Sequence, residues 1–110
     1  MTTITTEKNL ITLINVFTVA PENQQRLVDH LVEATQQIMR HLPGYISANI
    51  HKSLDGTRVT NYAQWRSQAD FEAMQNHPEA VVHMRAASQL ATSFEPHLYE
   101  VSFIDTIASS

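Results

Sequence analysis

The chain has 110 residues and a net charge of −4, from seven Lys and Arg against eleven Asp and Glu. This length suits one domain of about 100–200 residues, and the acidic balance counts against a nucleic-acid-binding module. The absence of cysteine excludes disulfide scaffolds, iron–sulfur clusters and cysteine nucleophiles, and the two glycines, Gly44 and Gly56, cannot form a GxGxxG fingerprint or a phosphate-binding loop.

Residues 1–9 are polar and rich in threonine, and we expect them to form a flexible N-terminal tail in front of a domain that spans residues 10–107. The apolar stretch at 10–20 is shorter than the roughly 20 residues of a membrane helix, and no basic segment precedes it. We therefore expect a cytoplasmic protein without a membrane span or signal peptide. The β-branched residues of this stretch predict a first strand over 10–19.

A long amphipathic helix is predicted next. Pro21 marks its start, because a proline at the first helical position loses no hydrogen bond. Apolar residues then recur at spacings of three and four until Pro43 and Gly44, which predict the end of the helix. The residues of this apolar stripe are Leu27, Leu31, Ala34, Ile38 and Leu42.

The next two predicted strands form a hairpin. Residues 45–53 alternate between side chains of different polarity, and residues 57–66 are rich in Thr, Val, Tyr and Trp, so both segments have the composition of strands. Asp55 and Gly56 lie between them, and this dipeptide is a frequent turn in hairpins. We therefore expect these strands to pair directly.

The remaining elements are predicted to be helical and then extended. Ser67 is a plausible N-cap, because Asp70 follows it in the first helical turn. A second helical segment is expected to start at Pro78 and to end before Pro96. Residues 98–107 alternate in polarity and predict the fourth strand.

The predicted order of elements is β-α-β-β-α-β, which is the ferredoxin-like arrangement of the α+β class. Its antiparallel sheet carries helices on one face only, so the other face must contact solvent or a partner. We expect apolar residues on that second face, and a homodimer packed sheet to sheet would bury them. These residues are Ile14, Val16, Ile46, Ala48 and Ile50.

The most unusual segment is NYAQW, residues 61–65. Strand alternation places Asn61, Ala63 and Trp65 on one face, and Asn15 occupies a similar position in the adjacent first strand. Asparagine is disfavoured inside strands, so two amides and an indole in an apolar cleft are typical of a small-molecule site. The alternative is that the amides pair with the backbone or with each other and that Trp65 is ordinary core.

Three further side chains are candidates for the same cleft. Arg85 lies among apolar residues of the last helix, and its guanidinium would suit an enolate, phenolate or carboxylate, unless it is simply exposed or paired with an acidic residue. His51 is a candidate proton carrier, and His83 could do the same or approach a haem iron. No spacing of histidines and acidic residues indicates a metal site.

The NYAQW segment, followed by Phe71 and Arg85, resembles the antibiotic biosynthesis monooxygenase family, as do the segments INVFTV at 14–19 and LPGYISA at 42–48. The resemblance covers roughly residues 10–107. It is most specific for small cofactor-free monooxygenases that oxidise aromatic polyketide anthrones to quinones. It implies a dimeric, ferredoxin-like α/β barrel whose partners are a small aromatic substrate and O2.

Carried over by position, the resemblance implies that Asn61 and Trp65 contact the substrate or oxygen and that Arg85 stabilises the reacting anion. The same superfamily includes haem-degrading monooxygenases, which use a strand asparagine, a helix histidine and a helix tryptophan. Asn15 and His83 match the first two of these, but the chain has no second tryptophan.

The chain departs from the family pattern at Phe71. In the best-known polyketide-oxidising member, a tyrosine involved in proton transfer occupies this position, and phenylalanine cannot donate a proton. His51 or Tyr62 would then have to substitute for it, unless the substrate differs or the activity is lost.

Three functions therefore stay open. The chain is a cofactor-free monooxygenase, a haem-binding or haem-degrading enzyme, or a non-catalytic dimeric module related to stress proteins. In the last case Asn61 and Arg85 would be paired with protein groups and no cavity would remain. A pocket of roughly 300 Å³ or more between sheet and helices would favour an enzyme.

Overall fold

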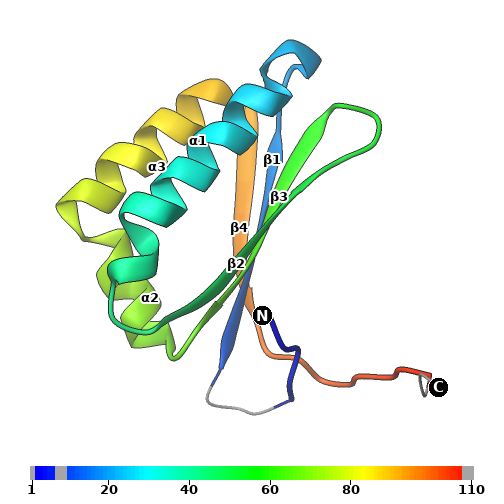
Figure 1. Cartoon of the computed structure of the whole chain (residues 1–110), viewed down its shortest axis with the longest axis vertical. Coiled ribbons are helices and arrows are strands. Elements are labelled where there is room, and N and C mark those ends of the chain that lie inside the picture. Colours follow the sequence, from blue (N-terminus) through cyan, green and yellow to red (C-terminus); the bar gives the residue numbers. More distant parts are fainter. Residues whose placement is uncertain (1, 7–9, 108–110) are drawn as a thin grey trace.

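The computed structural model describes residues 2–6 and 10–107 of the chain. Its helices and strands follow the predicted β-α-β-β-α-β order, with the second helical region divided in two (Figure 1). The elements are β1 (Ile11–Thr18), α1 (Gln24–Gln37), β2 (Tyr45–Lys52), β3 (Arg58–Trp65), α2 (Gln68–Gln75), α3 (Pro78–Leu90) and β4 (Ser93–Tyr99), with 3-10 turns at Pro21–Asn23 and Met39–His41.

The four strands form one antiparallel sheet in the order β2-β3-β1-β4, with β1 and β3 as the central pair. All the helices lie on one face of this sheet (Figure 1). The predicted ferredoxin-like α+β fold is therefore confirmed. The sheet of a single chain is open, with β2 and β4 at its edges, so the dimeric barrel stays a prediction.

The first helix is shorter than predicted. Its α-helical part ends at Gln37, and Ile38 already leaves the helical region with φ −122° and ψ −63°. The chain then continues as a 3-10 turn up to His41. Ile38 and Leu42 still pack against the core, so the apolar period continues although the α-helix has ended.

The predicted position of the last strand is wrong. β4 begins at Ser93 and ends at Tyr99, while residues 100–107 lie outside any helix or strand. Pro96 lies inside β4, where proline was expected to interrupt regular structure. An edge strand tolerates proline because one side of its backbone has no strand partner, and β4 pairs with β1 alone.

The core fills the space between the sheet and the helices. Its members come from both layers, and Leu27, Val59 and Ala80 have no exposed surface. One cluster surrounds Trp65 and Phe71, and another surrounds Leu27 and Val59. Together they hold α1, α2 and α3 against the same face of the sheet.

The prediction for the two faces of β2 is wrong. Ala48 and Ile50 pack against the helix-side core, although both were expected on the opposite face. The cause is an irregularity between Tyr45 and Ser47 in the pairing with β3, which shifts the alternation of side chains along the strand. Ile46, next to this irregularity, is 43% exposed.

The described part of the predicted N-terminal tail lies against the sheet. Thr2 Oγ1 donates a hydrogen bond to Asn49 Oδ1 at 2.8 Å, and Gln64 Nε2 donates to the Thr3 carbonyl at 2.7 Å. Gln64 is consequently only 2% exposed. The other tail residues, 1 and 7–9, lie outside the described part of the chain. Among the helices that the structure describes, none is long and apolar enough to cross a bilayer.

Candidate active site

A cavity of about 490 Å³ lies between the sheet and the helices. Its wall is mainly apolar and includes side chains from β1, β2, β3 and all three α-helices. Six of the eight predicted site residues line it, so the structure brings most of the candidates together. These six are Asn15, Asn61, Trp65, Phe71, His83 and Arg85.

Asn15 and Asn61 lie directly opposite each other on the two central strands. Both side-chain Oδ1 atoms are buried and have no hydrogen-bond partner within the described residues. An unpaired buried amide oxygen costs about 1–3 kcal/mol, so a fold gains nothing by placing two of them together. The arrangement instead presents two amide oxygens, which are hydrogen-bond acceptors, to whatever occupies the cavity, and the alternative that the protein satisfies both amides completely does not hold.

Trp65 forms one end of this wall and is 2% exposed. Two other rings meet it nearly edge to face: Tyr45 at 5.8 Å between ring centroids, and Phe71 at 6.2 Å. Such contacts fix the indole plane, because aromatic pairs of this geometry are attractive at these separations. A planar ligand would therefore meet a rigid indole.

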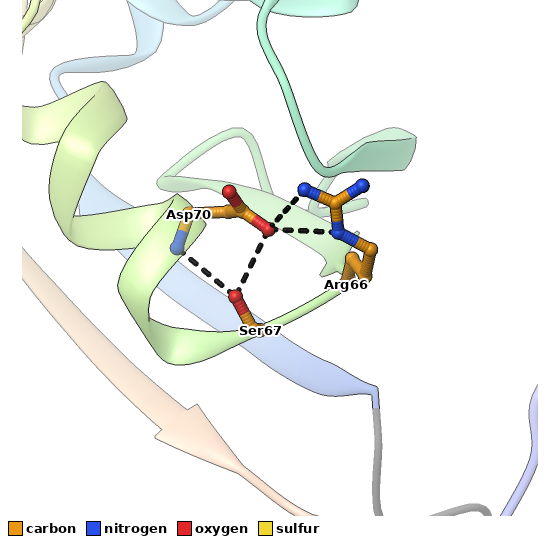
Figure 2. Close-up of polar contacts among 3 residues, drawn as sticks. All are labelled: Arg66, Ser67 and Asp70. Carbon is orange, nitrogen blue, oxygen red and sulfur yellow. Dashed lines mark hydrogen bonds and ion pairs between the residues drawn. The ribbon is translucent and has the colours of Figure 1, made fainter.

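The turn between β3 and α2 leads directly to Phe71, whose ring contacts Trp65. Figure 2 shows the polar contacts that hold this turn. Ser67 caps α2, since its Oγ accepts a hydrogen bond from the Asp70 backbone N–H at 3.1 Å and donates to Asp70 Oδ2 at 2.9 Å. Arg66 Nε donates to the same Oδ2 at 2.9 Å, and the Arg66 Nη2–Asp70 Oδ2 ion pair measures 2.8 Å. These contacts join the residue that follows β3 to the first turn of α2.

Two charged or titratable side chains of α3 line the opposite side of the cavity. Arg85 is exposed and forms no ion pair with any described residue. His83 is half-buried, and its ring packs at 5.4 Å from that of His30. His30 Nε2 donates a hydrogen bond to the His83 carbonyl at 2.9 Å, which ties α1 to α3 beside the cavity.

His51 and Tyr62 do not line the cavity, which corrects their predicted role in substrate binding. His51 is exposed, and its Nδ1 lies 3.1 Å from the Asn49 carbonyl. It pairs with Thr60 in the sheet, and Tyr62 pairs with Ile14 and Asn49, so both are on the face away from the helices. Neither residue can replace the hydroxyl that Phe71 lacks.

Tyr45 is a cavity residue that the sequence reasoning missed, because it was assigned to ordinary core. It also lines a second cavity of about 380 Å³, together with Arg40, Ser47 and Asn49. Burial raises the pKa of the Tyr45 phenol, although the Arg40 charge and a hydrogen bond to the Ala48 backbone oppose this rise. No sequence signal places it there, because Tyr45 pairs with Trp65 across the irregularity, and simple alternation along β2 would put it on the same face as His51.

The described residues contain no group of three or more His, Asp or Glu side chains placed to hold a metal ion. Polar groups on the cavity wall are amides, hydroxyls, an indole, a phenol, an imidazole and a guanidinium. These groups can hydrogen-bond a ligand, and the guanidinium favours one that carries or develops negative charge.

Comparisons with known proteins give the family of this chain. The family model described as "Antibiotic biosynthesis monooxygenase" matches residues 10–86. Tetracenomycin-F1 monooxygenase of Streptomyces glaucescens is 54% identical over 83 residues, which cover 76% of this chain and 74% of that protein.

Solved structures show the same fold. A monooxygenase from the ActVA-Orf6 gene of Streptomyces coelicolor, in complex with nanaomycin D, superposes with a TM-score of 0.79 at 25% identity, covering 91% of this chain and 93% of that one. SnoaB of Streptomyces nogalater, described as a cofactor-independent oxygenase, superposes with a TM-score of 0.74 at 19% identity, covering 92% and 99%. The second likeness concerns the fold alone.

Proposed function

The chain belongs to the antibiotic biosynthesis monooxygenase family, and from this premise we propose that it oxidises an electron-rich, anthrone- or quinol-like aromatic compound to a quinone with O2 and no cofactor. That it is a monooxygenase follows from the family and from the 54% identical relative. The substrate class and the independence from cofactors are the proposal. The relative's name, a monooxygenase of tetracenomycin F1, supports an aromatic polyketide substrate.

The observation that carries the proposal is the pair of unpartnered amides in an apolar cavity. Asn15 and Asn61 face each other with buried, unpaired Oδ1 atoms. An unpaired Oδ1 can accept a hydrogen bond from a phenolic hydroxyl, and the Nδ2 of the same amide can donate one to an anion; both act strongly because the apolar surroundings screen them little. A polycyclic aromatic substrate that packs against Trp65 could extend along the sheet and bring oxygen substituents to these amides.

The chemistry starts from the substrate, because singlet organic molecules react slowly with triplet O2 unless a cofactor or a substrate anion supplies an electron. Loss of a proton from the substrate gives a carbanion that is delocalised onto its phenolic oxygen. One electron passes to O2, and the two radicals combine to form a carbon–oxygen bond and a peroxide anion. The protein contributes amides that stabilise the anion and walls that exclude water.

Arg85 would stabilise negative charge at the side of the cavity formed by α3. It is exposed and has no acidic partner within the described residues, so its charge is available to the ligand. An ionised phenol, a carboxylate substituent or the peroxide would each be attracted to it.

The test uses protein stripped of metals and flavin. Oxygen uptake and quinone absorbance are followed with anthrones and dihydroxynaphthols as substrates. We expect one quinone for each O2 consumed. Asn61→Ala should lower kcat by about 10²-fold, as loss of an oxyanion donor does elsewhere. Asn76→Ala, at an exposed position outside the cavity, is the matched control.

Two results would contradict the proposal. Unchanged turnover in both Asn61→Ala and Trp65→Phe would remove these residues from the site. A Soret band that develops on addition of haemin and disappears in His83→Ala, with no oxidation of the aromatic panel, would favour the haem alternative instead. Trp65 is the one tryptophan of the chain, so quenching of its fluorescence measures ligand binding separately from turnover.

A further inference from the structure

The oxidation proposed above needs a proton to reach a peroxide anion, and Phe71 cannot supply it. Two rings contact Trp65 from different elements, Phe71 from α2 and Tyr45 from β2, and only Tyr45 carries a hydroxyl. We propose that the Tyr45 hydroxyl is the catalytic proton donor and acceptor of this enzyme, a role that rests on the proposed function. The hydroxyl would thus come from β2 and not from the position on α2 that Phe71 occupies.

The register of the sheet places Tyr45 near one end of the cavity, and the asparagines lie further along the same floor. Tyr45 pairs with Trp65, Ala48 pairs with Ala63, and Asn61 lies further along β3. The alanines line the cavity between these ends and leave room above the sheet. Four residues of strand separate Trp65 from Asn61, which corresponds to about 13 Å at ~3.3 Å per residue. A flat polycyclic substrate can extend along this floor, with its oxygens near the amides and another edge near Tyr45.

The surroundings of Tyr45 provide a route for proton exchange. The residue lines both the main cavity and the second, more polar cavity of about 380 Å³. Arg40, Ser47 and Asn49 border that second space. A proton that Tyr45 gives to the substrate in the main cavity can therefore be replaced from the second cavity, without opening the main one. Burial raises the pKa of the Tyr45 phenol above its ordinary value of 10.0, so the hydroxyl is protonated at neutral pH.

The groups that face the main cavity from other elements differ from Tyr45 in what they can do. The guanidinium of Arg85 can stabilise an anion, but this type of group does not serve as a proton donor. His83 is titratable, and its ring is packed against His30 on the side of α1 and α3. The positive charge of Arg40 acts to lower the pKa of the Tyr45 phenol, so it favours the phenolate that forms when the proton leaves.

The Tyr45 hydroxyl acts twice in this reaction, first as a proton donor and then as a base. The peroxide anion on the substrate carbon takes the Tyr45 proton, which gives a hydroperoxide and a phenolate. The phenolate then removes the remaining hydrogen of that carbon as a proton, and the electron pair of the broken C–H bond forms the C=O bond. The O–O bond breaks, and its electron pair leaves with hydroxide. Tyr45 is regenerated, one oxygen atom is in the quinone, and hydroxide becomes water on protonation by solvent.

The experiment compares wild type with Tyr45→Phe, which keeps the ring against Trp65 and removes only the hydroxyl. General acid–base catalysis contributes typically about 10²–10⁴-fold, so we expect kcat to fall by at least about 10²-fold. The affinity measured by Trp65 fluorescence should stay within about twofold. A substrate peroxide should accumulate, because its conversion into the quinone lacks both the proton donor and the base, and O2 uptake should then exceed quinone formation. Tyr99→Phe, an exposed tyrosine of β4 outside the cavity, is the matched control.

A second variant tests whether the loss of kcat is due to the missing hydroxyl. The combination of Tyr45→Phe with Phe71→Tyr returns a phenol to the other ring that contacts Trp65, and it should recover part of the lost kcat. An active wild type whose Tyr45→Phe variant matches its kcat and its quinone yield would overturn the role of Tyr45 and leave the proposed function standing. A wild type that oxidises none of the aromatic panel would overturn both.

Discussion

At the scale of single residues, the cavity contains polar groups that the fold itself leaves unsatisfied. Asn61 Oδ1 is buried without a partner, as is Asn15 Oδ1 opposite it. Asn49, on the other face of the sheet, shows the usual arrangement: its Nδ2 donates to the Tyr62 carbonyl at 3.0 Å and its Oδ1 accepts from Thr2. The contrast separates an amide kept for a ligand from one that stabilises the fold.

This contrast leads to a prediction for Asn61→Leu. Replacing an unsatisfied buried amide by an apolar group of similar shape should raise the free energy of unfolding by about 1 kcal/mol, while kcat falls by about 10²-fold. Asn49→Leu should instead lower the free energy of unfolding, because its hydrogen bonds are lost. Urea unfolding of both variants checks this. A destabilised Asn61→Leu protein would mean that the amide contributes to folding after all.

The site residues that could be predicted from the sequence are those fixed by regular strand alternation. Asn15, Asn61 and Trp65 lie on uninterrupted strands, so counting by twos gave their common face correctly. His51 was placed in the cleft wrongly because the irregular pairing near Tyr45 and Ser47 shifts the alternation in β2. Such an irregularity depends on the partner strand, and no local sequence pattern here indicates it.

At the scale of secondary structure elements, the junction between β3 and α2 determines the position of Phe71. Gly44 approaches this junction: its carbonyl accepts a hydrogen bond from the Arg66 N–H at 2.7 Å, its φ is +84°, and a Cβ built on it would collide with the Asp70 side chain. Gly56 has a similar φ of +81°, but the nearest atom to a Cβ there is Pro21 Cβ at 3.8 Å. The two glycines therefore differ in crowding alone.

Gly44→Ala should consequently be more destabilising than Gly56→Ala. Both variants pay for a left-handed backbone, about 1 kcal/mol, and the Gly44 variant also has to displace Asp70 from its cap, for a total of about 2–3 kcal/mol. Chemical denaturation gives both values. An equal loss of unfolding free energy in the two variants would show that Asp70 moves away without cost and that the junction adapts to the added methyl group.

The β2–β3 hairpin carries a pH-dependent contribution to stability. Asp55 Oδ1 accepts hydrogen bonds from Ser53 Oγ at 2.7 Å, the Thr57 N–H at 3.0 Å and Thr57 Oγ1 at 2.7 Å. The Thr57 and Ser53 side chains, with the Thr57 backbone, lower the pKa of Asp55 from 3.8 to about 2.

Because the folded pKa lies below the unfolded one, the contribution of Asp55 is complete above about pH 4 and is lost as the pH falls towards about 2. The difference in stability between wild type and Asp55→Asn should therefore shrink over this range. Denaturant unfolding between pH 5 and pH 2 measures it, and carboxyl chemical shifts give the pKa directly. A side-chain pKa near 3.8 would contradict the hydrogen-bonded geometry.

The elements themselves were predictable where helix and strand signals are local. Ser67 caps α2 as expected, and Pro78 begins α3 as expected. The bounds of β4 were predicted incorrectly, because Pro96 normally interrupts regular structure and its tolerance at a sheet edge follows only from the strand order. The early end of α1 could not be predicted either, because the apolar spacing continues through the 3-10 turn after Gln37.

At the scale of the whole molecule, the sheet has one face without helices (Figure 1). Val16 pairs with Thr60 and Glu95, and Ile14 pairs with Tyr62, so this outer face mixes apolar and polar side chains. Residues 100–107 extend away from the sheet, and Phe103 there is 69% exposed. A single chain thus leaves apolar surface on the side where a second copy would complete a barrel.

We therefore predict a homodimer that buries the outer face, and Val16→Lys tests it. A lysine at the centre of that face places an unpaired charge in the interface, which costs several kcal/mol and should dissociate the dimer. Val32→Lys is the matched control, because Val32 lies on α1 and is 37% exposed. Light scattering after gel filtration should give twice the chain mass for wild type and Val32→Lys, and one chain mass for Val16→Lys with unchanged circular dichroism. A wild type that stays monomeric at high concentration, or a Val16→Lys protein that stays dimeric, would place the contact elsewhere or remove it.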